Sequence, residues 1–86
     1  MVLNDTLSRN SVTVVGSGAK TLVLAHGFGC DQTMWDLLTP HLLNDFRIVL
    51  FDYVGSGKSD PRAFKGQKYA ELSGYAQDII DVCDSL

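Results

Sequence analysis

Two short, uninterrupted apolar runs constrain the fold of this chain more than any other feature. One is Thr-Leu-Val-Leu-Ala at residues 21–25, and the other is Arg-Ile-Val-Leu-Phe at residues 47–51. Continuous apolar runs of this length are typical of strands covered on both faces, as in a parallel sheet. Parallel strands need a long crossover between them, usually a helix. The two runs therefore predict an α/β fold.

The segments around these runs fit a third strand and two helical regions. Residues 11–15 alternate and are rich in β-branched side chains, so they predict a strand, with a turn at residues 9–10 from a shorter strand before it. Asp31 is expected to cap a helix that breaks at Pro40, where Thr39 would cap a new start. The last helix is expected to bury one apolar stripe, which consists of Leu72, Tyr75, Ala76, Ile79, Ile80, Cys83 and Leu86.

The order strand, strand, helix, strand, helix predicts a mostly parallel sheet with flanking helices. The chain has 86 residues, which allows one domain at most. It closes on a helix, where a fold of this kind is expected to continue with another strand. The pattern therefore predicts the first, incomplete part of an α/β domain.

Composition narrows the classes of function. The net charge is −3 without any cluster of Lys or Arg, so nucleic acid is not an expected partner. No apolar run reaches the length of a membrane span, and residues 1–10 lack the pattern of a signal peptide. Cys30 and Cys83 are expected to be free thiols packed in the core of a cytoplasmic protein, with a disulfide as the alternative.

The loop His26-Gly27-Phe28-Gly29 is the first candidate for chemistry, because it joins a buried strand to a helix start. Two glycines let the backbone turn sharply and approach a ligand. In acyl-transfer enzymes, a backbone N–H in such a loop can hold the oxygen that becomes negative in the transition state. The Phe28 N–H is the candidate donor. A plain strand-to-helix turn explains the same residues, and both interpretations stay open.

A second glycine loop, Gly-Ser-Gly-Lys-Ser at residues 55–59, has the ending of a phosphate-binding P-loop. That motif requires glycine five residues before its second glycine, where this chain has Asp52. A carboxylate there repels phosphate, and Pro61 falls where the first turns of the following helix are needed. A turn that redirects the chain after a strand is therefore the preferred interpretation, with a nucleotide site as the alternative.

The residues present do not assemble a serine triad. No Gly-x-Ser-x-Gly occurs, and the base of an α/β-hydrolase follows its nucleophile along the chain. His26 is therefore expected to orient its loop by hydrogen bonding rather than to act as a base. His41 is expected to be a surface or packing residue. Because the two histidines lack spaced Cys or Asp ligands, we expect no metal and no cofactor.

Together these segments resemble the RsbQ-like α/β-hydrolases, a group that includes the plant karrikin and strigolactone receptors. The resemblance runs from about Leu7 to Leu86. The His-Gly-Phe-Gly-x-Asp-Gln loop is specific to this group, whereas Gly-x-Gly-x-Ser-Asp is shared by many α/β-hydrolases. The segments that carry it are residues 26–32, Trp35, residues 51–60 and residues 74–78. The amino-acid sequences of residues 53–57 and 74–78 favour the RsbQ-like branch over the plant receptors.

The resemblance implies that residues 1–86 form the N-terminal part of a single α/β-hydrolase domain. It implies that Phe28 gives one oxyanion-hole N–H and lines an apolar pocket, with His26, Gly27 and Gly29 supporting the loop. The serine, acid and histidine of the triad, and a helical lid, would lie further along such a protein. The implied function is to bind or cleave a small hydrophobic ester or lactone in stress-response signalling through sigma factor regulation, with a phosphatase partner.

These 86 residues are expected to be inactive alone, since one oxyanion donor without a nucleophile attacks nothing. The alternative is a non-enzymatic truncated module, or a fragment that pairs with the remainder of the fold. In that case the strand at residues 21–25 would be an apolar edge, which invites pairing or self-association.

Overall fold

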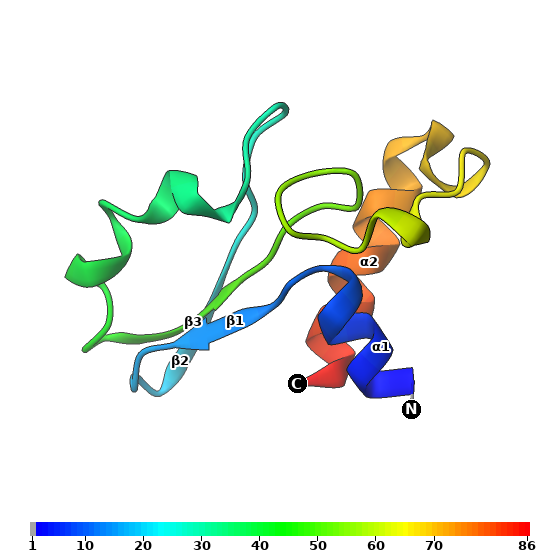
Figure 1. The fold of residues 1–86 in the computed structure, drawn as a ribbon. Helices are drawn as coiled ribbons and strands as arrows, with labels where there is room; N and C mark the ends of the chain where they lie inside the picture. The colour runs from blue at the N-terminus through cyan, green and yellow to red at the C-terminus, as the bar shows by residue number, and fades with distance from the viewer. Residues whose placement is uncertain (1) are drawn as a thin grey trace.

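The computed structural model describes residues 2–86 and contains two α-helices and a three-stranded sheet (Figure 1). The helices are α1 (Val2–Arg9) and α2 (Leu72–Ser85), and the strands are β1 (Thr13–Val15), β2 (Lys20–Leu24) and β3 (Phe46–Leu50). Short 3₁₀ turns at Gln32–Trp35, Thr39–His41, Pro61–Ala63 and Lys68–Ala70 lie in the connections. None of the helices within residues 2–86 has the length and hydropathy of a membrane-spanning segment.

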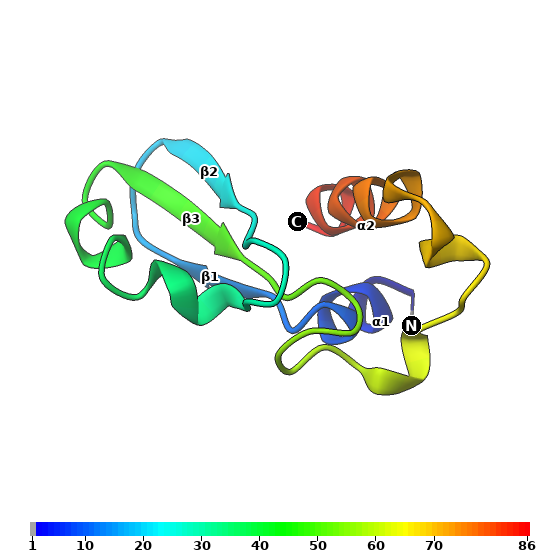
Figure 2. The same ribbon diagram turned by 90° about the horizontal axis from the view of Figure 1, so that it is seen from above.

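The strand order is β1-β3-β2, so β3 lies in the middle of the sheet (Figure 2). The predicted parallel pair is confirmed, because β2 runs parallel to β3 with Leu22 opposite Ile48. β1 pairs with the other side of β3 in the antiparallel sense. The connection from β1 to β2 therefore crosses the start of β3. A Cβ atom on Gly18 would lie 2.0 Å from the Asp45 carbonyl oxygen, which explains the glycine there.

The core of the sheet is confined to the middle strand and the residue that follows it. Ile48, Val49, Leu50 and Phe51 are buried. β2 is less covered than its apolar run predicts: Lys20 and Thr21 are exposed and Leu22 to Leu24 are half-buried. Within residues 2–86, β2 has a paired strand on one side alone, which makes it an edge of the sheet.

The region between β2 and β3 contains 3₁₀ turns instead of the expected helix. The predicted cap is confirmed, because the Asp31 carboxylate accepts a hydrogen bond from the Thr33 N–H at 2.9 Å. Pro40 opens the second turn as expected, but the predicted Thr39 cap is wrong. Leu38 occupies the cap position, and the Thr39 hydroxyl donates instead to the Trp35 carbonyl at 2.7 Å.

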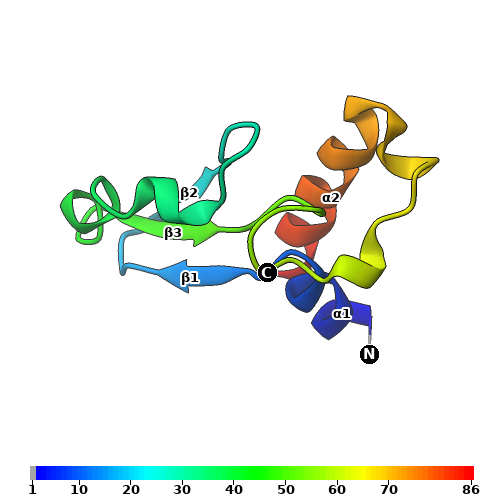
Figure 3. The ribbon, with the colours of Figure 1, turned by 45° about the horizontal axis from the view of Figure 1, so that its top comes forward.

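A helix, α1, precedes β1 where a shorter strand was expected. It lies beside α2 in Figures 1 and 2, and an ion pair joins them, with Arg9 Nη2 3.2 Å from Asp78 Oδ1. Both helices lie at the end of the molecule where β3 leads into the loop of residues 51–60 (Figure 3). Asn10, which is fully buried, joins α1 to that loop, since its side chain donates to the Asp52 carbonyl at 2.9 Å.

The burial of α2 differs most from expectation. Its buried residues are Gly74, Asp78 and Val82, whereas the predicted stripe faces outward, with Leu72 84% exposed and Ile80 51% exposed. Gly74 is buried because the Lys68 carbonyl oxygen lies 1.9 Å from where its Cβ would be. Cys83 and Cys30 are both exposed, so their predicted place in the core is wrong. The predicted free thiols are present.

Asp78 is the buried anchor of the helical end. Its carboxylate is fully buried and accepts hydrogen bonds from Lys68 Nζ and from the Tyr69 hydroxyl, each at 2.7 Å. Burial, together with this hydrogen bond, raises the pKa of Tyr69. Burial opposes the charge of Lys68, but the bond to Asp78 and its negative charge together raise the pKa of Lys68. A buried charge needs such partners, so Asp78 fixes α1, α2 and the turn at Lys68–Ala70 to one another.

Candidate functional site

The site begins where β2 ends, at a buried histidine. His26 is 5% exposed, and its Nε2 accepts a hydrogen bond from the Tyr53 N–H at 3.0 Å. Its Nδ1 lies 2.9 Å from the Gly27 carbonyl oxygen. Because a carbonyl oxygen accepts only, Nδ1 must carry the proton and Nε2 must not. Both ring nitrogens are thus engaged and the ring is neutral, which suits a residue that orients the loop rather than a general base.

The turn that follows presents Phe28 to the outside. The Phe28 side chain is fully exposed, and within residues 2–86 its N–H meets no hydrogen-bond acceptor. The Gly29 N–H is likewise without an acceptor within residues 2–86, whereas Gly27 N donates to Met34 Sδ at 3.3 Å and Cys30 N donates to the Gly27 carbonyl at 3.1 Å. Gly29 has a φ of 76°, a left-handed conformation that favours glycine. A free N–H at an exposed turn can bind an anionic oxygen.

A buried carboxylate, Asp52, stands behind this turn. It is 2% exposed, and its two oxygens accept hydrogen bonds from two backbone groups: Gln32 N at 2.8 Å and Lys58 N at 2.9 Å. Its own N–H donates to the Asn10 carbonyl at 2.7 Å. Asp52 therefore connects the segment after the Phe28 turn with the glycine loop at residues 55–58.

The glycine loop is built around Asp52 and not around a phosphate. The Lys58 N–H, which a P-loop would offer to phosphate, is taken by the carboxylate. Gly57 has a φ of 51°, and a Cβ there would lie 2.4 Å from Asp52 Oδ2. The element directly after the loop is a 3₁₀ turn at Pro61–Ala63, where a P-loop would have an α-helix. These contacts argue against the nucleotide-binding alternative.

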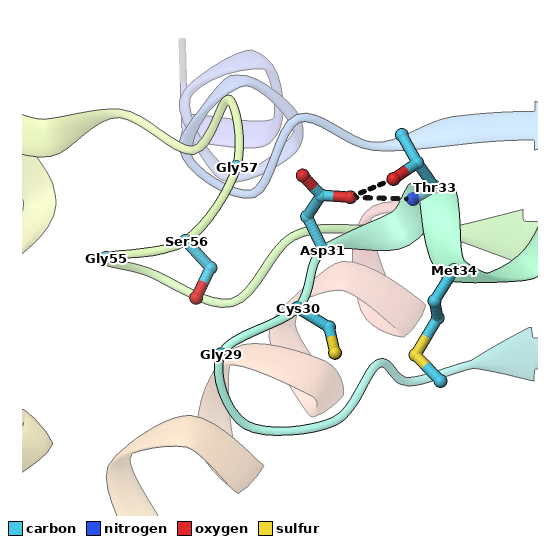
Figure 4. A pocket seen from close by; sticks show the side chains of 8 residues that line it. All are labelled: Gly29, Cys30, Asp31, Thr33, Met34, Gly55, Ser56 and Gly57. Carbon is cyan, nitrogen blue, oxygen red and sulfur yellow. Dashed lines mark hydrogen bonds between the residues drawn. The ribbon is translucent and has the colours of Figure 1, made fainter.

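The two loops face each other across a small polar cavity of about 570 Å³ (Figure 4). The turn with Gly29 and Cys30 forms one wall, and the loop with Gly55 and Ser56 forms the other. Asp31 also lines the cavity, and its carboxylate is turned toward Thr33, whose hydroxyl and N–H both donate to it. These two hydrogen bonds lower the pKa of Asp31.

A larger apolar groove of about 760 Å³ lies on the other side of the same turn. His26, Gly27 and Gly29 line it beside Phe28, so the four predicted loop residues meet in one place. The wall across from them comes from α2 and the loop before it, and its apolar side chains are Val54, Phe64, Leu72, Tyr75 and Ile79. Because His26 is neutral, no lining residue carries a formal charge.

Aromatic rings connect the loop to the helical wall. The Tyr53 ring packs edge-on against His26, with ring centroids 4.7 Å apart, and edge-on against Tyr75 at 5.8 Å. Such tilted contacts are the favoured geometry of aromatic pairs. The exposed face of α2 is therefore positioned as one wall of the groove above the Phe28 turn.

No protein-family model matches the chain. It is 47% identical over 76 residues to a karrikin insensitive 2 receptor of Petunia hybrida, covering 88% of this chain and 28% of the relative. It is 40% identical over 86 residues to strigolactone esterase D14 of Arabidopsis thaliana, covering all of this chain and 32% of the relative. A hydrolase structure from Oleispira antarctica matches with a TM-score of 0.91 at 45% identity, over 95% of this chain and 30% of that one.

The chain is homologous to part of the α/β-hydrolase fold. This confirms the predicted fold class and the resemblance to the group of karrikin and strigolactone receptors. The chain spans about a third or less of the length of these relatives. The narrower RsbQ-like assignment, and the roles of Phe28, His26, Gly27 and Gly29 in catalysis, stay predictions.

The sequence did not predict the roles of two residues, Asp52 and Asn10. Asp52 appeared there only as a mismatch to a P-loop, and Asn10 only as a turn residue. The available signal was an acidic residue directly after the most apolar strand, which has to find hydrogen bonds when it is buried. His41 is exposed, which is one of its two predicted positions. Within residues 2–86, no cluster of three or more His, Cys, Asp or Glu side chains is arranged to hold a metal.

Proposed function

We propose that this chain is the N-terminal part of a serine hydrolase that binds a small, uncharged, hydrophobic ester or lactone and cleaves it. The observation that carries the proposal is the unpartnered Phe28 N–H at the edge of an apolar groove. A groove without charged side chains favours an apolar ligand, and an N–H held at its edge can stabilise the negative oxygen of a tetrahedral intermediate.

In this mechanism the attacking serine comes from a part of the fold outside residues 2–86. Its oxygen adds to the carbonyl carbon of the ligand, and the carbonyl oxygen takes up the negative charge. The Phe28 N–H donates to that oxygen as one of two donors. A general base outside residues 2–86 takes the serine proton in the attack and gives it to the alcohol when the intermediate collapses and the C–O bond breaks. The acyl group stays on the serine until water releases it.

The test is an assay of two proteins: residues 1–86 alone and the longest product of the gene. We expect the longer product to hydrolyse p-nitrophenyl butyrate and to react covalently with a fluorophosphonate probe, and residues 1–86 to do neither. Absence of both turnover and labelling in a folded longer product would overturn the proposal. Turnover by residues 1–86 alone would overturn the claim that the nucleophile lies outside residues 2–86.

For the biological role, we propose RsbQ-like stress-response signalling in the cytoplasm, by sigma factor regulation and through a phosphatase partner. The amino-acid sequences of residues 53–57 and 74–78, which resemble the RsbQ-like branch, support this role. A pull-down from cells of the source organism, before and after stress, tests it. Recovery of a phosphatase is expected, and the absence of any phosphatase under both conditions would count against this role.

A second candidate is a non-enzymatic module that pairs with another chain or segment. It is favoured by the edge of β2 that has no paired strand within residues 2–86, and by the exposed apolar face of α2, where Leu72 is 84% exposed. Edges and faces of this kind are pairing surfaces. Light scattering on residues 1–86 separates the candidates. A concentration-dependent oligomer is expected for the module, and a stable monomer would speak against it.

A further inference from the structure

The carboxylate of Asp52, next to the proposed oxyanion site, is buried and hydrogen-bonded in a way that core packing does not explain. Asp52 is 2% exposed, yet within residues 2–86 it forms no ion pair with Lys, Arg or His. Its carboxylate is satisfied instead by two backbone N–H groups, from Gln32 and Lys58. Burying a carboxylate is costly, and an apolar side chain would fill the same space without that cost. The carboxylate of Asp52 therefore has a role other than packing.

The backbone of Asp52 is itself fixed, so its carboxylate is a stationary point. Its N–H donates to the Asn10 carbonyl at 2.7 Å, and its carbonyl accepts from the Asn10 side chain at 2.9 Å. Asn10 is fully buried at the end of α1. A displacement of the Asp52 backbone would therefore break two further hydrogen bonds.

The Phe28 turn is held at both ends by this one stretch of backbone. At the start, His26 Nε2 accepts from the N–H of Tyr53, the residue after Asp52. At the end, the Gln32 N–H donates to Asp52 Oδ1. Residues 27–31 thus form a span closed by residues 52 and 53, and the unpartnered N–H groups of Phe28 and Gly29 lie inside it. The other carboxylate oxygen holds the Lys58 N–H in the loop that faces this turn.

We propose that Asp52 is a positioning residue for the reaction, which sets the place of the Phe28 N–H by fixing the end of its turn. The inference rests on the proposed function, in which that N–H binds the oxyanion. A misplacement of about 1 Å in such a site can cost about a hundredfold in rate. The interaction is made in the transition state, so its loss lowers kcat more than it changes KM.

Asp52→Asn tests the carboxylate with little change in shape. An amide side chain has one acceptor oxygen, and its NH₂ group would face one of the two N–H donors, so one hydrogen bond is lost. In the longest product of the gene we expect kcat for p-nitrophenyl butyrate to fall about tenfold to a hundredfold, with KM changed by about twofold or less.

Gln32 offers a test from the donor side. Gln32→Pro removes the N–H that Asp52 accepts. Proline fits this first position of a turn, and Asp31 before it has the extended backbone that proline requires, with φ −151° and ψ −173°. Gln32→Ala is the matched control, because both variants lose the side-chain bond to the Ser11 carbonyl but Ala keeps the N–H. We expect kcat of the Pro variant to be about tenfold below that of the Ala variant.

Amide hydrogen exchange supplies a readout that does not depend on activity. We expect Asp52→Asn to speed the exchange of the Gln32 N–H and to shift the Phe28 and Gly29 amide resonances. Equal kcat for the Pro and Ala variants, together with wild-type kcat in folded Asp52→Asn protein, would overturn the inference. Failure of the proposed function is distinguishable, because the wild-type longest product of the gene would then show neither turnover nor labelling, whereas exchange of the Gln32 N–H would still respond to Asp52→Asn.

Discussion

The turn around Phe28 and the outer face of α2 are the two walls of one groove, but they are built in opposite ways. Behind the turn, His26 and Asp52 have every polar atom of their side chains engaged with nearby backbone. The outer face of α2 leaves Leu72 and Ile80 more than half exposed. The first wall is fixed by hydrogen bonds within residues 2–86, whereas the second presents apolar surface to solvent.

This contrast between the turn and the helix face shows which parts of the site are fixed by contacts within the chain. Buried hydrogen bonds have strict geometry, so they fix the position of a backbone N–H closely. Apolar contact is non-directional, so an exposed helix face can accept many shapes. The turn is therefore the candidate for chemistry, and the helix face is the candidate for contact with a ligand or a covering segment.

The largest expected effect comes from removing the Phe28 N–H. Phe28→Pro should lower kcat of the longest gene product by about 10²- to 10³-fold, or about 2.7–4 kcal/mol, because one oxyanion donor is lost. Steady-state kinetics with p-nitrophenyl butyrate measure it. Phe28→Leu keeps the N–H and is the control. A similar kcat for the Pro and Leu variants would assign Phe28 to ligand contact alone.

The second prediction contrasts the inner and outer faces of α2. Asp78→Ala should lower the free energy of unfolding by about 3 kcal/mol, because Arg9 and Tyr69 lose a fully buried partner. Leu72→Ser, on the outer face, should change it by about 0.5 kcal/mol or less, since Leu72 is exposed. Urea unfolding followed by circular dichroism measures both. Equal losses would contradict the assigned burial of α2.

The third prediction concerns the loop that faces the turn. Gly57→Ala should cost about 2 kcal/mol, since φ is 51° and the new Cβ would lie 2.4 Å from Asp52 Oδ2. Gly66→Ala is the matched control, because nothing lies within 4 Å of a Cβ there. Urea midpoints give the comparison. If both glycines tolerate alanine equally, the described packing of the loop on Asp52 is wrong.

The smallest effect is expected at Asp31, where the hydrogen bonds from Thr33 hold the pKa below its ordinary value of 3.8. A carboxyl group whose pKa is lowered by folding adds stability above its unfolded pKa and loses it as pH falls through the folded pKa. The free energy of unfolding should therefore be slightly higher for the wild type than for Asp31→Asn at pH 7. At strongly acidic pH the two should be equal. Urea midpoints across this range test it, and a pH-independent difference would refute the role of the charge.

The sequence predicts the elements whose signals are local. The runs at residues 21–25 and 47–51 match β2 and β3 to within one residue, because apolar character and length identify strands. The Asp31 cap and the helix from residue 72 are also local signals, and both are confirmed.

The remaining features depend on contacts far apart in the chain. The stripe of α2 faces outward because Asp78, on the opposite side, is held by Lys68, Tyr69 and Arg9, and no periodicity reveals such a cluster. Asp52 likewise gains its partners from residues 20 positions before it and six positions after it. Sequence reasoning found the Phe28 turn itself but not the carboxylate behind it.

The central claim is that the Phe28 N–H binds the oxyanion, and the amide resonance of Phe28 tests it most directly. An alkyl boronic acid forms a tetrahedral, negatively charged adduct with a serine nucleophile, and its effect can be followed in a ¹H–¹⁵N spectrum of the longest gene product. We predict that the Phe28 amide proton moves downfield and exchanges more slowly on adduct formation. An unchanged Phe28 resonance, while neighbouring amides in the groove respond, would contradict the account.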